Sequence, residues 1–288
     1  MLNKTWFMRT ILIILSAALL FSFQQANEFY HIIKVDGSIV NTATGKPLSP
    51  GDNIKPNDRL KFNSPYATAL VISNTRGKFT LKYQSTESKD LFNDKKELLA
   101  MADNAVTPID SRGMLATRGI GLSEVRDLKN YFGPDNFYVI GKNLSVKLNK
   151  TVYPLNDNQY IVFSYPINNE TKSKKVGFDN QYLKIDGDAL ASLSKDTGSG
   201  PATLKDISVY KLDKSANKSD LITKVNLVFL DEDKIKAEFD VIIPFLKDQK
   251  MDRFKVLDYL KSYFNDVYGS TDPDVLFTTI NKELGKYF

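Results

Sequence analysis

The amino terminus of the chain places two cationic residues, Lys4 and Arg9, before the uncharged and mostly apolar run 10–23. A cationic start followed by an apolar stretch is the layout of a secretory signal peptide. We therefore expect residues 1–26 to be a signal peptide. This feature constrains the fold first, because it sets the compartment in which the rest of the chain must be stable.

The apolar run also leaves two questions of processing open. Ala26 is the expected last residue of the signal, and Ser22 offers another cleavage point. The run of about 14 residues is shorter than the roughly 20 that cross a bilayer as a helix, which favours cleavage. The alternative is an uncleaved signal anchor, lengthened by residues 6–8, and only in that case do we expect membrane association.

Export is combined with a complete absence of cysteine. The chain can therefore form no disulfide framework, thiolate nucleophile, cysteine metal site or lipid-modified amino-terminal cysteine. Its stability must come from apolar cores, for which the chain is long enough. The net charge is +5, with lysines spread among acids along the whole sequence. This mixed surface argues against nucleic-acid binding, which uses a clustered basic stripe.

Residues 27–83 alternate short apolar segments with turn residues, as at Asp36-Gly37. Five or six short strands with such regular turns predict a small β-sandwich or barrel. The turn and strand motifs follow in the order Val35-Asp36-Gly37, Pro47-Leu48, Gly51-Asp52, Asp58-Arg59-Leu60, Ala67-Thr68-Ala69-Leu70 and Gly77-Lys78-Phe79-Thr80-Leu81. This order resembles that of the periplasmic β-domain of FecR-type proteins.

The FecR resemblance implies an envelope β-domain and, by analogy, a role as a sensor or regulator. The sequence departs from FecR in one respect, because only a short segment precedes the apolar run where the family has a cytoplasmic anti-sigma segment. A soluble envelope module is therefore favoured over a transmembrane signalling protein.

Residues 84–133 are mostly polar, and we expect a linker with short helices. One of these helices is expected from Ser123 to Phe132, ended by Gly133. A glycine- and arginine-rich loop precedes this helix. The favoured interpretation is an irregular loop that needs the backbone freedom of glycine. The alternative is an anion-binding site formed by backbone N–H groups and cationic side chains. The candidate residues of this loop are Arg112, Arg118, Gly119, Gly121 and Arg126.

Two further segments follow. Residues 134–194 read as an antiparallel β-unit, and residues 205–288 as a hairpin followed by two helices. We expect the hairpin to pair 221–230 with 235–246. Whether 134–194 and 205–288 form one domain is left open.

The carboxyl-terminal helices are expected from two local patterns. Apolar residues recur at helical spacing in 251–268, namely Phe254, Leu257, Leu260, Phe264 and Val267. Asp272 followed by Pro273 predicts an N-cap and first helical residue. The expected fold class is thus mainly β with a carboxyl-terminal α+β part.

The residues that could do chemistry are few. His31 is the only histidine and stands at the start of a predicted strand, so we read it as a surface or edge residue. One histidine without cysteine excludes the usual zinc sites. The acids at Asp186, Asp188 and 231–233 look like turns and lack the calcium-loop pattern. We therefore predict no catalytic residues, no metal and no cofactor.

These patterns favour an exported, non-enzymatic binding or assembly module whose partner is another envelope protein. The bacterial periplasm or envelope is the expected location, and an extracellular one is the alternative. Two other functions stay open: a carboxylate-dependent hydrolase of glycan or peptide, and the sensor that the FecR resemblance implies. A pocket with converging acids would favour the hydrolase, and an apolar patch at a strand edge would favour the module.

Overall fold

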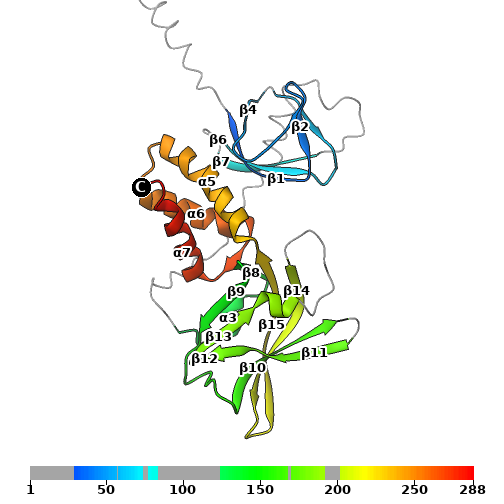
Figure 1. The fold of residues 1–288 in the computed structure, drawn as a ribbon, viewed down its shortest axis with the longest axis vertical. Coiled ribbons are helices and arrows are strands. Elements are labelled where there is room, and N and C mark those ends of the chain that lie inside the picture. The colour runs from blue at the N-terminus through cyan, green and yellow to red at the C-terminus, as the bar shows by residue number, and fades with distance from the viewer. Residues whose placement is uncertain (1–28, 57, 74–76, 84–123, 168–169, 192–201) are drawn as a thin grey trace, which may run out of the picture. The chain divides into compact units, whose positions relative to one another are not determined.

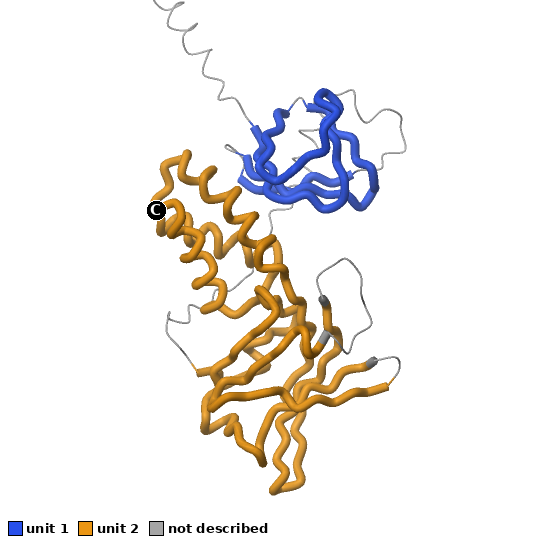
Figure 2. The backbone as a smooth tube through the Cα atoms, viewed as in Figure 1, with its two compact units in different colours: residues 1–107 blue, residues 108–288 orange. Residues whose placement is uncertain are grey.

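The computed structural model describes six stretches of the chain, residues 29–56, 58–73, 77–83, 124–167, 170–191 and 202–288. The expected signal peptide 1–26 and most of the predicted linker 84–133 lie outside them. The chain divides into two compact units, residues 1–107 and 108–288 (Figure 2). Strands predominate over helices in the described residues, which confirms the predicted mainly β class.

The first unit contains two small antiparallel sheets, with strand orders β4-β1-β6-β7 and β3-β2-β5 (Figure 1). No sheet in the described residues closes into a barrel. The strands are β1 Tyr30–Asp36, β2 Ile39–Asn41, β3 Lys46–Pro47, β4 Asn53–Ile54, β5 Leu60–Phe62, β6 Thr68–Ser73 and β7 Gly77–Lys82.

Both sheets contribute to one apolar core. Tyr30 of β1 and Phe79 of β7 meet edge to face, with ring centroids 5.0 Å apart, and Ile39 of β2 is fully buried in the same cluster. The predicted turn at Asp36-Gly37 has a clear physical cause. Gly37 has φ +84°, and a Cβ atom there would lie 3.0 Å from the Cβ of Ala67, so only glycine fits.

The second unit is built on a six-stranded sheet of order β11-β10-β14-β15-β8-β16 and a three-stranded sheet of order β12-β13-β9. Their apolar faces enclose a large core that includes Phe132, Phe137, Phe163 and Leu227. The strands are β8 Asn136–Ile140, β9 Asn143–Lys147, β10 Gln159–Ile167, β11 Glu170–Lys175, β12 Gly177–Asp179, β13 Tyr182–Asp186, β14 Ala202–Asp213, β15 Lys218–Leu230 and β16 Ser270–Thr271.

Strands from 134–194 and 205–288 share the larger sheet. β10 pairs antiparallel with β14, whereas β8 runs parallel to both β15 and β16. The prediction of a purely antiparallel unit at 134–194 is therefore wrong for β8. Its parallel partners lie far along the chain, so no local turn signal could reveal them.

The predicted hairpin of 221–230 with 235–246 is wrong. The long hairpin of the fold is β14–β15, and 235–246 lies in helix α5, Glu232–Asp248. Val241-Ile242-Ile243 followed by Pro244 favours a strand by local propensity. Packing decides otherwise, because the buried residues of α5 follow helical spacing, including Ile235, Phe239, Ile242 and Leu246.

Two helices follow α5, as predicted: α6 Arg253–Val267 and α7 Pro273–Leu284. The three contact one another in a helical layer (Figure 1). The predicted α6 stripe is partly wrong, because Leu260 and Phe264 are buried whereas Phe254 is 77% exposed. In the described ranges no helix is long and apolar enough to cross a membrane.

Two short helices complete the described unit, α3 Leu128–Phe132 and α4 Gly187–Ala191. α3 ends at Gly133 as predicted, but its N-cap is Asp127, whose carboxylate accepts from the N–H of Asn130. The cap predicted at Ser123 lies outside the described residues.

Candidate functional site

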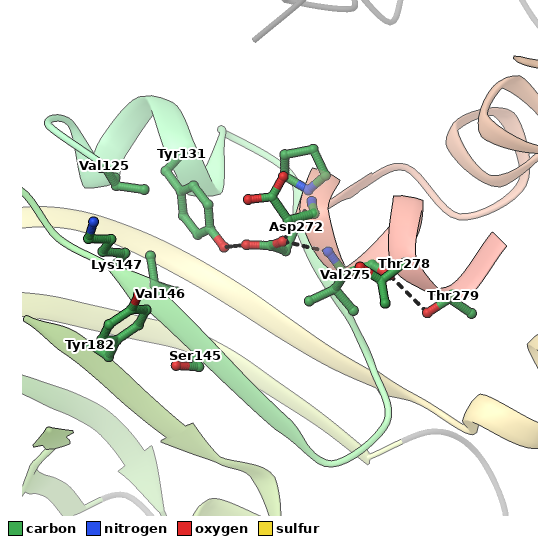
Figure 3. Close-up of a pocket in the computed structure, with 12 residues that line it drawn as sticks. Val125, Tyr131, Ser145, Val146, Lys147, Tyr182, Asp272, Val275, Thr278 and Thr279 are labelled. Carbon is green, nitrogen blue, oxygen red and sulfur yellow. Dashed lines mark hydrogen bonds between the residues drawn. The ribbon is translucent and has the colours of Figure 1, made fainter. Parts of the chain in front are cut away.

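A pocket of about 320 Å³ opens in the second unit where β9, β13 and α3 approach the first turn of α7 (Figure 3). Segments far apart in sequence form its walls, and they present charged, polar, aromatic and aliphatic side chains together. The lining residues used below are Val125, Tyr131, Ser145, Val146, Lys147, Tyr182, Asp272, Pro273, Asp274, Val275, Thr278 and Thr279.

Asp272 organises the helical wall of the pocket. Its Oδ1 accepts hydrogen bonds from the backbone N–H groups of Asp274 and Val275, both at 2.9 Å. This is the N-cap that the Asp272-Pro273 pair predicts, and it satisfies two N–H groups that have no partner within the helix. The prediction of this helix start is confirmed.

The other carboxylate oxygen of Asp272 joins α7 to α3. The hydroxyl of Tyr131 donates to Oδ2 at 2.6 Å, across 141 positions of sequence (Figure 3). Tyr131 is itself held against Phe132 and Phe137, with ring centroids 5.1 and 5.2 Å away. Asp272 is therefore engaged at both oxygens, and its position is fixed by the core behind Tyr131.

Asp274 is the second carboxylate of the pocket and is exposed. Partial loss of solvent, followed by the like charge of Asp272, raises the pKa of its carboxyl above the usual value. No hydrogen bond to the side chain of Asp274 is assigned in the described part of the chain. It is thus the wall carboxylate that remains open to a ligand.

The sheet wall carries hydroxyl and amine groups. Ser145 Oγ accepts from Lys184 Nζ at 2.9 Å, and Lys147 Nζ lies 3.5 Å from the carboxylate of Glu124. Lys184 also lies over the ring of Tyr182, 5.3 Å from its centroid. These residues occupy one face of the β9–β13 pair, because paired residues of two strands point to the same side.

Among the candidate anion-binding residues, none that the structure describes lines this pocket. Arg112, Arg118, Gly119 and Gly121 lie outside the described residues, and Arg126 is exposed in the segment before α3. The anion site therefore stays a prediction.

The other sequence candidates have local structural roles. His31 Nδ1 lies 2.7 Å from Asn53 Oδ1 across the β1–β4 pair. Asp186 accepts from the N–H of Ala189, and Asp188 pairs with Lys142 at 3.1 Å. In the described ranges, no three or more histidine, aspartate or glutamate residues are grouped so that they could hold a metal ion.

The acidic run 231–233 starts a helix. Asp231 is the N-cap of α5, and its Oδ1 accepts from the N–H of Asp233 at 3.0 Å. The predicted turn at this point is therefore a helix start, with acids where the helix macrodipole favours them.

A second tyrosine–carboxylate cluster lies buried between α5 and α6. Glu238 is only 5% exposed, and its two oxygens accept from the hydroxyls of Tyr263 at 2.8 Å and Tyr268 at 2.6 Å. Burial, and then the neighbouring Glu238, raise the pKa of Tyr263 above its ordinary value. This cluster is enclosed by the helices and does not line the pocket.

Sequence reasoning finds Asp272 as a cap but misses Tyr131, Ser145, Lys147 and Tyr182. For Ser145, Lys147 and Tyr182, the local signal is polar alternation in β9 and β13, which is common to any half-exposed sheet. No family model and no curated protein matches this chain. The geometry of the pocket therefore has to carry the functional argument.

Proposed function

We propose that the protein is an exported, non-enzymatic binding or assembly module of the cell envelope, and that the pocket beside α7 is its recognition site. The amino-terminal signal pattern and the FecR resemblance of residues 29–83 support the envelope setting. The pocket supports the binding role, since it combines aliphatic, aromatic and charged walls on rigid elements.

The observation that carries the proposal is the hydrogen bonding of the Asp272 carboxylate. Its two oxygens are held by two backbone N–H groups and the Tyr131 hydroxyl. A carboxylate so engaged positions the wall of the pocket and is poorly placed to exchange protons with a substrate. The site therefore presents shape and charge without a free acid–base pair.

The test is capture of partners from the envelope fraction of the source cell by the tagged chain that starts at Asn27. A matched pair of variants locates the contact: Thr278→Trp fills the pocket from the exposed face of α7, and Ser262→Trp adds the same bulk on α6. We expect one stoichiometric envelope protein, retained by Ser262→Trp and lost with Thr278→Trp. Absence of any partner, with turnover of cell-wall material, would overturn the proposal.

A carboxylate-dependent hydrolase is the second candidate, and one observation favours it. Asp272 and Asp274 line the same pocket, and the raised pKa of Asp274 is a property of catalytic acids. Asp274→Asn separates the two functions, because it would abolish glycan or peptide turnover by a hydrolase. The binding module shows no turnover before or after this change.

A further inference from the structure

β9 is an exposed edge of the three-stranded sheet, whose order is β12-β13-β9. The carbonyl of Lys147 accepts from the N–H of Val125 at 2.8 Å, so the backbone polar groups of Lys147 point away from β13. Backbone direction alternates along an antiparallel strand. Ser145, two residues earlier, therefore presents its N–H and C=O to the same open edge.

Among the described residues, this edge is paired only at one end. Val125 forms an isolated parallel bridge with Leu148, beyond the last residue of β9. No described strand pairs with β9 beside Ser145 on this side. Within the described ranges, the outward backbone groups of Asn143 and Ser145 are therefore the ones left for an added strand.

β11, an edge strand of the larger sheet, is protected against pairing with another chain. β11 carries Lys172, Lys174 and Lys175 within six residues, and lysine on an edge discourages pairing with another chain. β9 has a single lysine, Lys147, at its end. Its charge is opposed by Glu124 at 3.5 Å.

The charge of the pocket beside this edge selects a cation. With Lys147 opposed by Glu124, the charges left beside the pocket are the Lys184 amine on the sheet wall and the carboxylates of Asp272 and Asp274 on the α7 wall. The helix macrodipole adds about half a positive charge at this end, so the α7 wall is the negative side of the pocket. An anion is also disfavoured because Asp272 already occupies the N–H groups of the first turn.

We propose that β9 binds an extended segment of a partner protein as an added strand, with a lysine or arginine of that segment entering the pocket beside Asp274. Main-chain hydrogen bonds to Ser145 supply affinity, and the pocket supplies the choice of side chain. Pro273 and Val275 give the aliphatic stem of the cation an apolar wall. This inference rests on the proposed binding function and specifies its partner.

The test uses ¹⁵N-labelled chain from Asn27 and three blocked pentapeptides. The first is threonine-valine-lysine-valine-threonine, the second has glutamine in place of lysine, and the third keeps lysine but carries N-methyl groups on one edge of its backbone. We expect the first to shift the amide signals of Ser145, Lys147, Asp274 and Thr278. The glutamine peptide should bind roughly fivefold more weakly, and the N-methylated peptide should not bind.

Substitutions in the protein test where the peptide binds. Asp274→Asn should weaken the lysine peptide to the level of the glutamine peptide, whereas the matched control Asp233→Asn, at the same position after the α5 cap, should leave binding unchanged. Ser145→Pro removes the outward N–H and the Oγ that accepts from Lys184, keeps the backbone ladder to β13, and should abolish binding. If this variant does not fold, the N-methylated peptide tests the same bond.

The inference would be overturned if the peptides shift no amide signals, or if the lysine and glutamine peptides shift them equally. Amide shifts at another sheet edge would overturn it as well. An envelope partner still captured by Asp274→Asn and Ser145→Pro would overturn it too, while leaving the binding module intact. Cell-wall turnover without any partner would instead remove the proposed function itself.

Discussion

Two carboxyl groups in the helical part of the second unit accept hydrogen bonds from tyrosine hydroxyls, but their settings differ. Glu238 lies in the middle of α5 and is enclosed with Tyr263 and Tyr268. Asp272 starts α7, accepts from Tyr131 and lines an open pocket. The same pairing therefore joins two helices in one place and positions the wall of a pocket in the other.

The largest loss of stability is expected from substitution of the enclosed Glu238. Glu238→Ala leaves the hydroxyls of buried Tyr263 and half-buried Tyr268 without this acceptor and should lower the free energy of unfolding by about 3 kcal/mol. Glu238→Gln keeps one carbonyl oxygen and should cost less. Urea unfolding followed by circular dichroism measures both, with Asp248→Ala, at the exposed end of α5, as the control. A loss below about 1 kcal/mol for Glu238→Ala would mean that the cluster does not hold the helices together.

Asp272→Ala should have the next largest effect. It removes a helix cap, worth about 1 kcal/mol, and the acceptor of the Tyr131 hydroxyl, worth about 1 kcal/mol more. Asp231→Ala removes only the equivalent cap of α5 and should cost about half as much. The same urea measurement compares them, and equal losses would show that the Tyr131 bond adds nothing to stability.

Tyr131→Phe isolates that bond and should cost about 1 kcal/mol, because Asp272 keeps its solvent access and its cap bonds. A double-mutant cycle with Asp272→Ala should return most of this value as coupling energy. Purely additive losses would place the energy of Tyr131 in its ring packing instead.

The smallest effect expected is on the pH dependence of stability, through the titration of Asp274. Its raised pKa means that the folded state holds the proton more tightly than the unfolded state, so stability falls as pH rises from the unfolded to the folded pKa. NMR titration of the side-chain carboxyl should give a midpoint above the usual value of about 3.9.

Asp274→Asn should remove this pH dependence, and the stability gap between variant and parent should narrow as pH falls through the raised pKa. Asp233→Asn serves as the control at the matched position of α5. A titration midpoint at or below the usual value would contradict the like-charge pocket.

The comparison also shows where prediction from sequence succeeds. The Asp272-Pro273 start of α7 is predictable because cap hydrogen bonds join residues within three positions of each other. The Gly37 turn is predictable for the same reason, since a positive φ is a local demand. Both features depend on a few neighbouring residues and not on the rest of the fold.

Prediction fails where two local signals compete or where the partner is distant. The β-branched run at 241–243 favours a strand, yet packing against α6 and α7 makes it part of a helix. Tyr131 and Asp272 carry no shared pattern, because only the folded sheet brings them together. The candidate pocket could not be predicted for this reason.

Local patterns in the sequence are sufficient to predict the mainly β class, turns between short strands, the start of the last helix and the absence of cysteine chemistry. These follow from backbone preferences and hydrogen bonds that act over a few residues. Long-range packing, by contrast, sets the helical state of α5, the parallel pairing of β8 with β15 and the approach of β9 to α7 across a pocket. Each of these depends on the burial of apolar faces between segments far apart in the chain, which local patterns do not encode.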